Sequence, residues 1–168
     1  MKKSFWLRAS PIGLALCLAW QAPWGLAQAP LQGMNELPIH DVARAGNRKD
    51  VEALLKVSAQ NRDARTPLGA TPLHYAAMNP DVGPLKALVG AGANPNARDL
   101  EGRTPLHMAA FSTRTPHTKL LLQAGADPLL KTEAGRDVLS LARKVRADEV
   151  AGEISLWILK GCKPGRPC

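Results

Sequence analysis

The heptapeptide TPLHYAA at 71–77 returns as TPLHMAA at 104–110, which is 33 residues further along the chain. Weaker copies lie at 37–40 and at 137–142. A fixed period of this length indicates a solenoid of small stacked units, and degraded outer copies are typical of its ends. The same shift also aligns Leu88 with Leu121, Gly92 with Gly125, Ala93 with Ala126, Pro95 with Pro128, and Gly102 with Gly135.

Each unit is predicted to be a pair of short helices. Thr71 and Thr104 suit the N-cap of a helix, and the proline after each suits the first helical position, where a missing N–H costs nothing. Apolar residues recur at helical spacing in the segments that follow. The expected ranges are 73–78 and 106–111 for the first helices, 84–89 and 116–123 for the second helices, and 94–103 and 127–136 for hairpin-like loops.

The T-P-L-H-x-A-A pattern, with its second helix and G-A-D/N turn, resembles the ankyrin repeat family over roughly residues 35–158. The resemblance implies an all-α ankyrin-repeat solenoid of about four helix-turn-helix repeats with protruding hairpin loops, present as a monomer. Trp157 is expected to cover the end of the core. The expected domain is 37–158, divided into repeats at about 37–70, 71–103, 104–136 and 137–158.

The first 27 residues are predicted to be a secretory signal peptide, followed by an extension at 28–36. Lys2, Lys3 and Arg8 precede an apolar run at 12–20, which is too short to span a bilayer stably. We therefore expect a periplasmic protein with no stable membrane insertion. A lipoprotein cut at Cys17 is the alternative, disfavoured because Leu16 is too large for the position before that cysteine.

The basic tail at 159–168 contains Cys162 and Cys168, the only cysteines left after removal of the leader. In an oxidising compartment this pair is expected to form a disulfide across the Pro-Gly turn between them. A redox-active pair and a zinc site are the alternatives, but C-x-x-C spacing and a following histidine are both lacking.

No catalytic, metal or cofactor motif is recognisable, so we expect neither an enzyme nor a bound cofactor. In the ankyrin family the histidine of TPLH has a structural role, which implies hydrogen bonds rather than a metal for His40, His74 and His107. His117 is expected to be exposed. Asp99 and Glu101 are expected on a loop tip in water, where neither acquires the shifted pKa that acid–base catalysis needs.

Loss of the leader lowers the formal charge of the chain from +8 to +5. This excess is compatible with an acidic protein, an anionic surface or nucleic acid. Only Tyr75, Phe111 and Trp157 remain as aromatic residues, which are too few for a base-stacking platform, so no nucleic acid is expected.

The resemblance to ankyrin repeats implies a binding face made of loop tips and of the exposed side of the first helices. Met78 and Phe111 stand at equivalent positions there, either as anchors for a partner or packed against a neighbouring loop. The predicted protein-binding residues are Arg44, Tyr75, Met78, Asn79, Arg98, Asp99, Leu100, Glu101, Phe111, Ser112, Lys131 and Glu133.

The function predicted from the sequence is an exported, non-catalytic module that binds one specific periplasmic protein. Small exported bacterial proteins of this build resemble accessory factors of envelope or stress-protection proteins, or immunity proteins against a toxin. The alternative is an envelope-attached structural protein that uses its basic residues, and an enzyme is disfavoured by the missing motifs.

Overall fold

The computed structural model describes residues 37–162, which contain eight α-helices and a short 3-10 helix at Ala59–Asp63. The predicted leader at 1–27 and the extension at 28–36 lie outside the described residues. So does Cys168; Cys162 is disulfide-bonded, and its pairing with Cys168 stays a prediction. The helices are α1 (Pro38–Ala45), α2 (Arg48–Val57), α3 (Pro72–Ala76), α4 (Gly83–Gly90), α5 (Pro105–Phe111), α6 (Thr115–Gln123), α7 (Val138–Lys144) and α8 (Asp148–Leu159).

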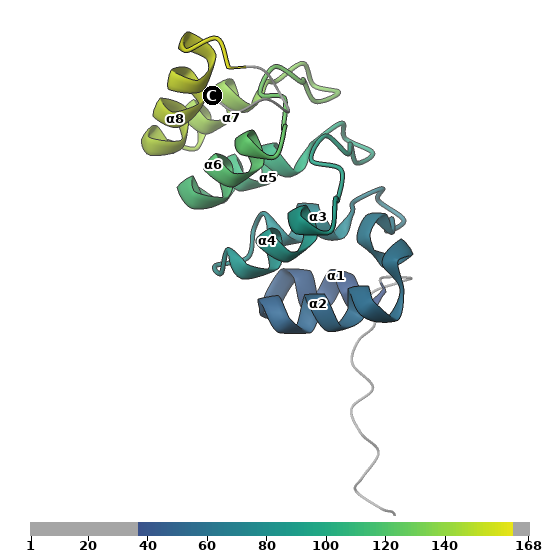
Figure 1. Ribbon diagram of the computed structural model, residues 1–168. Helices are drawn as coiled ribbons and strands as arrows, with labels where there is room; N and C mark the ends of the chain where they lie inside the picture. Colours follow the sequence, from purple (N-terminus) through teal and green to yellow (C-terminus); the bar gives the residue numbers. More distant parts are fainter. Residues whose placement is uncertain (1–36, 163–168) are drawn as a thin grey trace, which may run out of the picture. The chain divides into compact units, whose positions relative to one another are not determined.

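Consecutive helices pack as four pairs, and the pairs stack on one another in chain order (Figure 1). The first helices of the pairs, α1, α3, α5 and α7, form one layer. The second helices, α2, α4, α6 and α8, form the other layer. Every pair of helices in substantial contact belongs to the same repeat or to adjacent repeats, as expected for a solenoid. The predicted all-α repeat architecture is confirmed.

The first helices begin where the sequence indicates. Thr71 and Thr104 have extended backbone angles, and the proline after each is the first helical residue. Asp137 takes the same place before α7, where its carboxylate accepts a hydrogen bond of 2.7 Å from the Ser140 N–H. The three caps therefore set the start of successive first helices at one period.

The core runs continuously through the stack and is made of short and medium apolar side chains. Leu73 and Leu106 from the first helices and Leu88 and Leu121 from the second helices have no exposed surface. Paired alanines in α3 and α5 are also fully buried, and their small size lets neighbouring first helices approach closely. Trp157 packs against the last part of this core, as predicted.

Three tight turns project from the first-helix layer: hairpin 1 (66–70), hairpin 2 (99–103) and hairpin 3 (132–136). Each is closed by a backbone hydrogen bond of about 3 Å between its first N–H and its last C=O. Each also has glycine at its fourth position, and Gly102 has a φ of +71° that side chains rarely adopt. A Cβ on Gly102 would also lie 2.9 Å from the backbone nitrogen of Glu133.

Neighbouring hairpins are joined by backbone hydrogen bonds at their tips. The Leu100 N–H donates to the Leu68 C=O at 3.0 Å, and the Glu133 N–H donates to the Glu101 C=O at 2.9 Å. The tips are therefore held in a fixed series rather than as independent loops. Within 37–162, no helix is long and apolar enough to cross a membrane.

Candidate protein-binding surface

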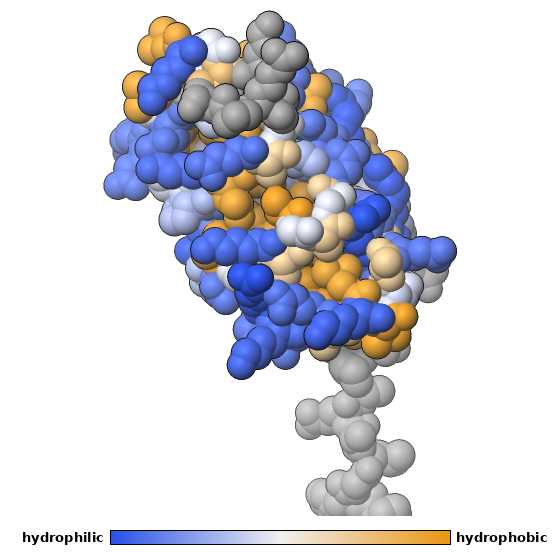
Figure 2. Space-filling view, viewed as in Figure 1, coloured by the Kyte–Doolittle hydropathy of each residue, from blue (hydrophilic) through white to orange (hydrophobic). Residues whose placement is uncertain are grey.

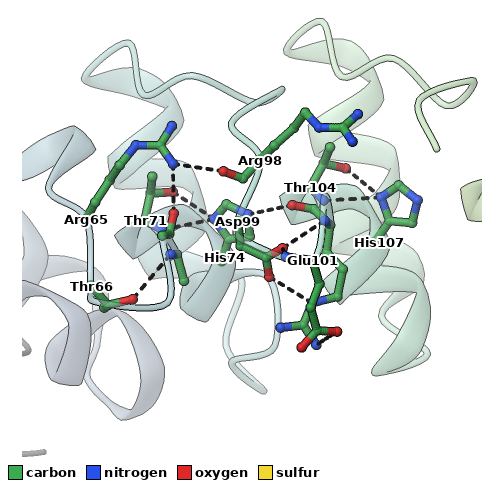
Figure 3. Close-up of polar contacts among 12 residues, drawn as sticks. Arg65, Thr66, Thr71, His74, Arg98, Asp99, Glu101, Thr104 and His107 are labelled. Carbon is green, nitrogen blue, oxygen red and sulfur yellow. Dashed lines mark hydrogen bonds and ion pairs between the residues drawn. The ribbon is translucent and has the colours of Figure 1, made fainter. Parts of the chain in front are cut away.

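Buried histidines connect each first helix to the hairpin that follows it (Figure 3). The Nδ1 atom of His74 accepts the Thr71 N–H at 3.0 Å, and its Nε2 atom lies 3.1 Å from the Arg103 C=O. His107 repeats this arrangement one period later, with Thr104 and the Arg136 C=O. The structural role implied for these histidines is confirmed.

These contacts define the protonation state of the two imidazoles. A backbone N–H can only donate, so Nδ1 of His74 is unprotonated, and a carbonyl can only accept, so Nε2 carries the proton. Burial lowers the pKa of His74 and of His107 below 6.5, which also favours the neutral ring. Both histidines are therefore neutral hydrogen-bonding posts under the hairpins.

The prediction that His117 is exposed is wrong. Its side chain is 2% exposed at the start of α6, and Nε2 lies 3.4 Å from the Asp81 C=O in the α3–α4 connection. Burial lowers the pKa of His117 as well. Among residues 37–162, no three histidine, cysteine, aspartate or glutamate side chains cluster closely enough to hold a metal ion.

Asp99 is also buried, which corrects its prediction as an exposed binding residue. Its carboxylate accepts the N–H groups of Glu101 at 3.0 Å and Arg103 at 2.8 Å, and it pairs with the Arg103 guanidinium at 2.7 Å. The side chain is only 2% exposed. Asp99 thus stabilises hairpin 2 from within and has no free oxygen face for a partner.

Asn79 is a second correction, because it is 2% exposed and serves as a structural bridge. Its amide NH₂ donates to the carbonyls of Ala43 at 3.0 Å and Gly46 at 3.1 Å, at the end of α1. Its side-chain oxygen accepts the Asp81 N–H at 2.8 Å. The amide therefore fastens the first repeat to the second and cannot contact a partner.

Asn79→Ala is expected to lower the free energy of unfolding by about 1 to 3 kcal/mol, because it leaves buried backbone groups without partners. Urea denaturation followed by circular dichroism measures the change. Asn79→Asp keeps the acceptor for Asp81 but loses both donors, so it is expected to be nearly as damaging. A loss below about 0.5 kcal/mol for Asn79→Ala, the size of an ordinary surface substitution, would contradict the bridging role.

The most prominent hollow among the described residues lies between hairpin 2, hairpin 3 and the helices α5 and α7. It has a volume of about 420 Å³, within the range of roughly 300 to 1,000 Å³ typical of ligand sites. Its apolar lining is Leu100, Met108, Phe111 and Leu141, and charged side chains from the two hairpins border it. We call this feature the hollow.

Two of the side chains that line the hollow are unusually exposed for their type. Phe111 is 60% exposed and Leu100 is 70% exposed. Figure 2 shows that, on the face it presents, hydrophobic residues lie in patches between hydrophilic ones. Exposed large apolar side chains gathered beside a hollow are a common mark of a protein interaction site.

The structure brings together only some of the predicted binding residues. Leu100, Glu101, Phe111 and Glu133 line the hollow. Tyr75 and Arg44 instead lie against each other in neighbouring repeats, with the guanidinium 4.4 Å from the ring centre. The remaining accessible residues lie outside the hollow: Met78 and Ser112, which are half-buried, and Arg98 and Lys131, which are exposed.

The sequence prediction missed Met108, Leu141, Arg103 and Arg136, all of which line the hollow. A signal for two of them was available, because Met108 and Leu141 follow the predicted residue Tyr75 at successive intervals of 33 residues. Arg103 and Arg136 are likewise one period apart, at the last position of hairpins 2 and 3.

The ion pairs around the hollow are uneven. Arg103 contacts both Asp99, at 2.7 Å, and Glu101, at 3.1 Å. Glu133 pairs with Arg98 at 3.0 Å across the two hairpins. Arg136 is exposed and forms no ion pair with any residue of 37–162. The acidic groups at the hollow are thus engaged, while one arginine is not.

Comparison with known proteins agrees with this architecture. A family model described as ankyrin repeats, in three copies, matches residues 38–132, which is more than half of the chain. No curated protein is significantly similar to the chain. The matched region contains α1 to α6 and both complete TPLH motifs. The chain therefore belongs to the ankyrin repeat family.

Proposed function

We propose that this protein is an exported, non-catalytic binding module that holds one specific protein partner in the periplasm, through the hollow and the adjoining hairpin tips. Ankyrin repeats are in general protein–protein interaction modules and are not generally catalytic. The partner is an envelope or stress-protection protein that the module assists, or a toxin that it neutralises. The export step rests on the leader-like sequence at 1–27.

The observation that carries the binding proposal is the exposed Phe111 ring beside the hollow. A folded chain gains stability by burying such a ring, so leaving it 60% exposed has a cost that binding would recover. Phe111 adjoins further apolar surface from Met108 and Leu141. A central apolar anchor with charged residues around it is the usual composition of a protein interface.

The rigidity of the surface supports the same proposal. Hairpins 2 and 3 are tied to each other by the Glu133–Glu101 backbone bond and the Arg98–Glu133 ion pair. His107 fixes hairpin 3 to α5 beneath them. A surface ordered before binding loses little conformational entropy on association, which favours affinity.

Phe111→Asp tests the proposal. The partner is first captured from periplasmic extract with the purified protein and identified by mass spectrometry, and its Kd is then measured by calorimetry. Removing a central anchor typically costs 2 kcal/mol or more, so we expect Phe111→Asp to weaken binding by about 30-fold or beyond. Its thermal unfolding should remain close to that of the unmodified protein, because the ring is largely exposed.

Leu129→Asp is the matched control, since Leu129 is 64% exposed but does not line the hollow. It is expected to leave the Kd unchanged. Equal binding by both variants and the unmodified protein would contradict the interface. A salt-sensitive association with anionic vesicles that survives Phe111→Asp would instead support the envelope-attached alternative.

A further inference from the structure

We propose that the hollow recognises an acidic segment of the partner, with a large apolar side chain among Met108, Phe111 and Leu141 and a carboxylate against Arg136. This inference rests on the proposed function and specifies the chemistry of the partner. It follows from the charges of the two hairpins that border the hollow.

Hairpins 2 and 3 have the same backbone but different charges. Both end in Gly-Arg, as Gly102-Arg103 and Gly135-Arg136. In hairpin 2, Asp99 and Glu101 both contact Arg103 and neutralise it. The equivalent positions of hairpin 3 hold Thr132 and Ala134, which carry no charge. Hairpin 3 therefore keeps the arginine and lacks both of its carboxylate partners.

The position of Arg136 is fixed although its guanidinium is not paired. Its backbone C=O accepts the bond that closes hairpin 3 and lies 3.3 Å from Nε2 of His107. Its side chain is exposed at the edge of the hollow. A guanidinium offers five N–H donors and binds carboxylates in a two-pronged geometry. Arg136 thus presents a held, unneutralised donor to anything that enters the hollow.

The carboxylates around the hollow do not offer a matching site for a cation. Glu101 and Asp99 are both engaged by Arg103, and Glu133 is engaged by Arg98. A basic ligand would have to displace one of these arginines, whereas an acidic ligand displaces only water. Charge complementarity therefore favours carboxylates beside the apolar anchor.

A peptide selection tests this inference. Random 12-residue peptides displayed on phage are selected on the purified protein, and the enriched peptides are synthesised for Kd measurement by fluorescence polarisation. We expect peptides in which aspartate or glutamate flanks a leucine, isoleucine, phenylalanine or tryptophan. We expect Arg136→Glu to weaken the best of them by about tenfold or more, and added salt to weaken it further.

Two controls isolate the charge effect. Lys86→Glu makes the same change of charge at an exposed position of α4 away from the hollow, and it is expected to leave the Kd unchanged. Replacing the acidic residue of the peptide by lysine should restore binding to Arg136→Glu, which a general loss of structure could not produce.

The other outcomes separate this inference from the proposed function. Enriched peptides that are neutral or basic, but that no longer bind Phe111→Asp, would overturn the acidic specificity and leave the interface intact. Enriched peptides insensitive to both Phe111→Asp and Arg136→Glu would overturn both. Failure to enrich any peptide, or equal binding by Arg136→Glu, would overturn the recognition of a linear acidic segment.

Discussion

Leu121→Ala is expected to lower the free energy of unfolding by about 2 to 5 kcal/mol. Leu121 lies in α6 with no exposed surface, at the position that Leu88 occupies in α4 one period earlier. Shortening its side chain removes buried apolar area and leaves a cavity in a core that each repeat shares with its neighbours. Leu88→Ala is expected to behave in the same way.

Urea denaturation followed at 222 nm by circular dichroism measures this loss. Leu129→Ala, at a leucine that is 64% exposed in the same repeat, is the control and should change stability by less than about 0.5 kcal/mol. Equal stability of the Leu121→Ala and Leu129→Ala variants would contradict the stacked core.

Acidification is expected to destabilise the protein at a pH where its carboxylates are still charged. Burial is the main cause that lowers the pKa of His74, His107 and His117 below 6.5. The unfolded chain then binds more protons than the folded chain, so stability is fully present above pH 6.5 and falls as the pH drops below it. Each histidine contributes a slope of at most about 1.4 kcal/mol per pH unit, and the three together about 4.

Urea denaturation at a series of pH values from 7.5 to 4.5 measures this effect, and the imidazole resonances in NMR assign it to individual residues. Asp137 does not interfere, because its pKa is lowered from 3.8, chiefly by the Ser140 N–H, and it titrates at lower pH. His117→Asn should make the dependence shallower by about one histidine's share. Stability that stays constant between pH 7 and pH 5 would contradict the neutral state of all three rings.

The fold could be predicted from the sequence because it depends on local signals that repeat. Thr71 and Thr104 with their following prolines mark the helix starts, and the interval of 33 residues implies stacking without any knowledge of distant contacts. The roles of the histidines followed from the same register. Such features are fixed within one repeat or between neighbours.

The binding residues were harder to predict, because residues at similar sequence positions have different surroundings. Asn79 and Ser112 are equivalent in the repeat, yet Asn79 turns inward to two carbonyls at the end of α1. Asp99 reads as a loop-tip acid in the sequence, but Arg103 and two backbone N–H groups enclose it. Only the exposure of Phe111 distinguished its two possible roles.

The backbone bonds that join one hairpin tip to the next also determine how such a protein can grow. Leu100 bonds to Leu68 and Glu133 bonds to Glu101, so each turn requires only the turn before it. A tandem duplication of 71–103 would supply a new turn with the same donor and acceptor on its two edges. The recognition surface can thus be lengthened in units of one gene segment without redesign of what is already there.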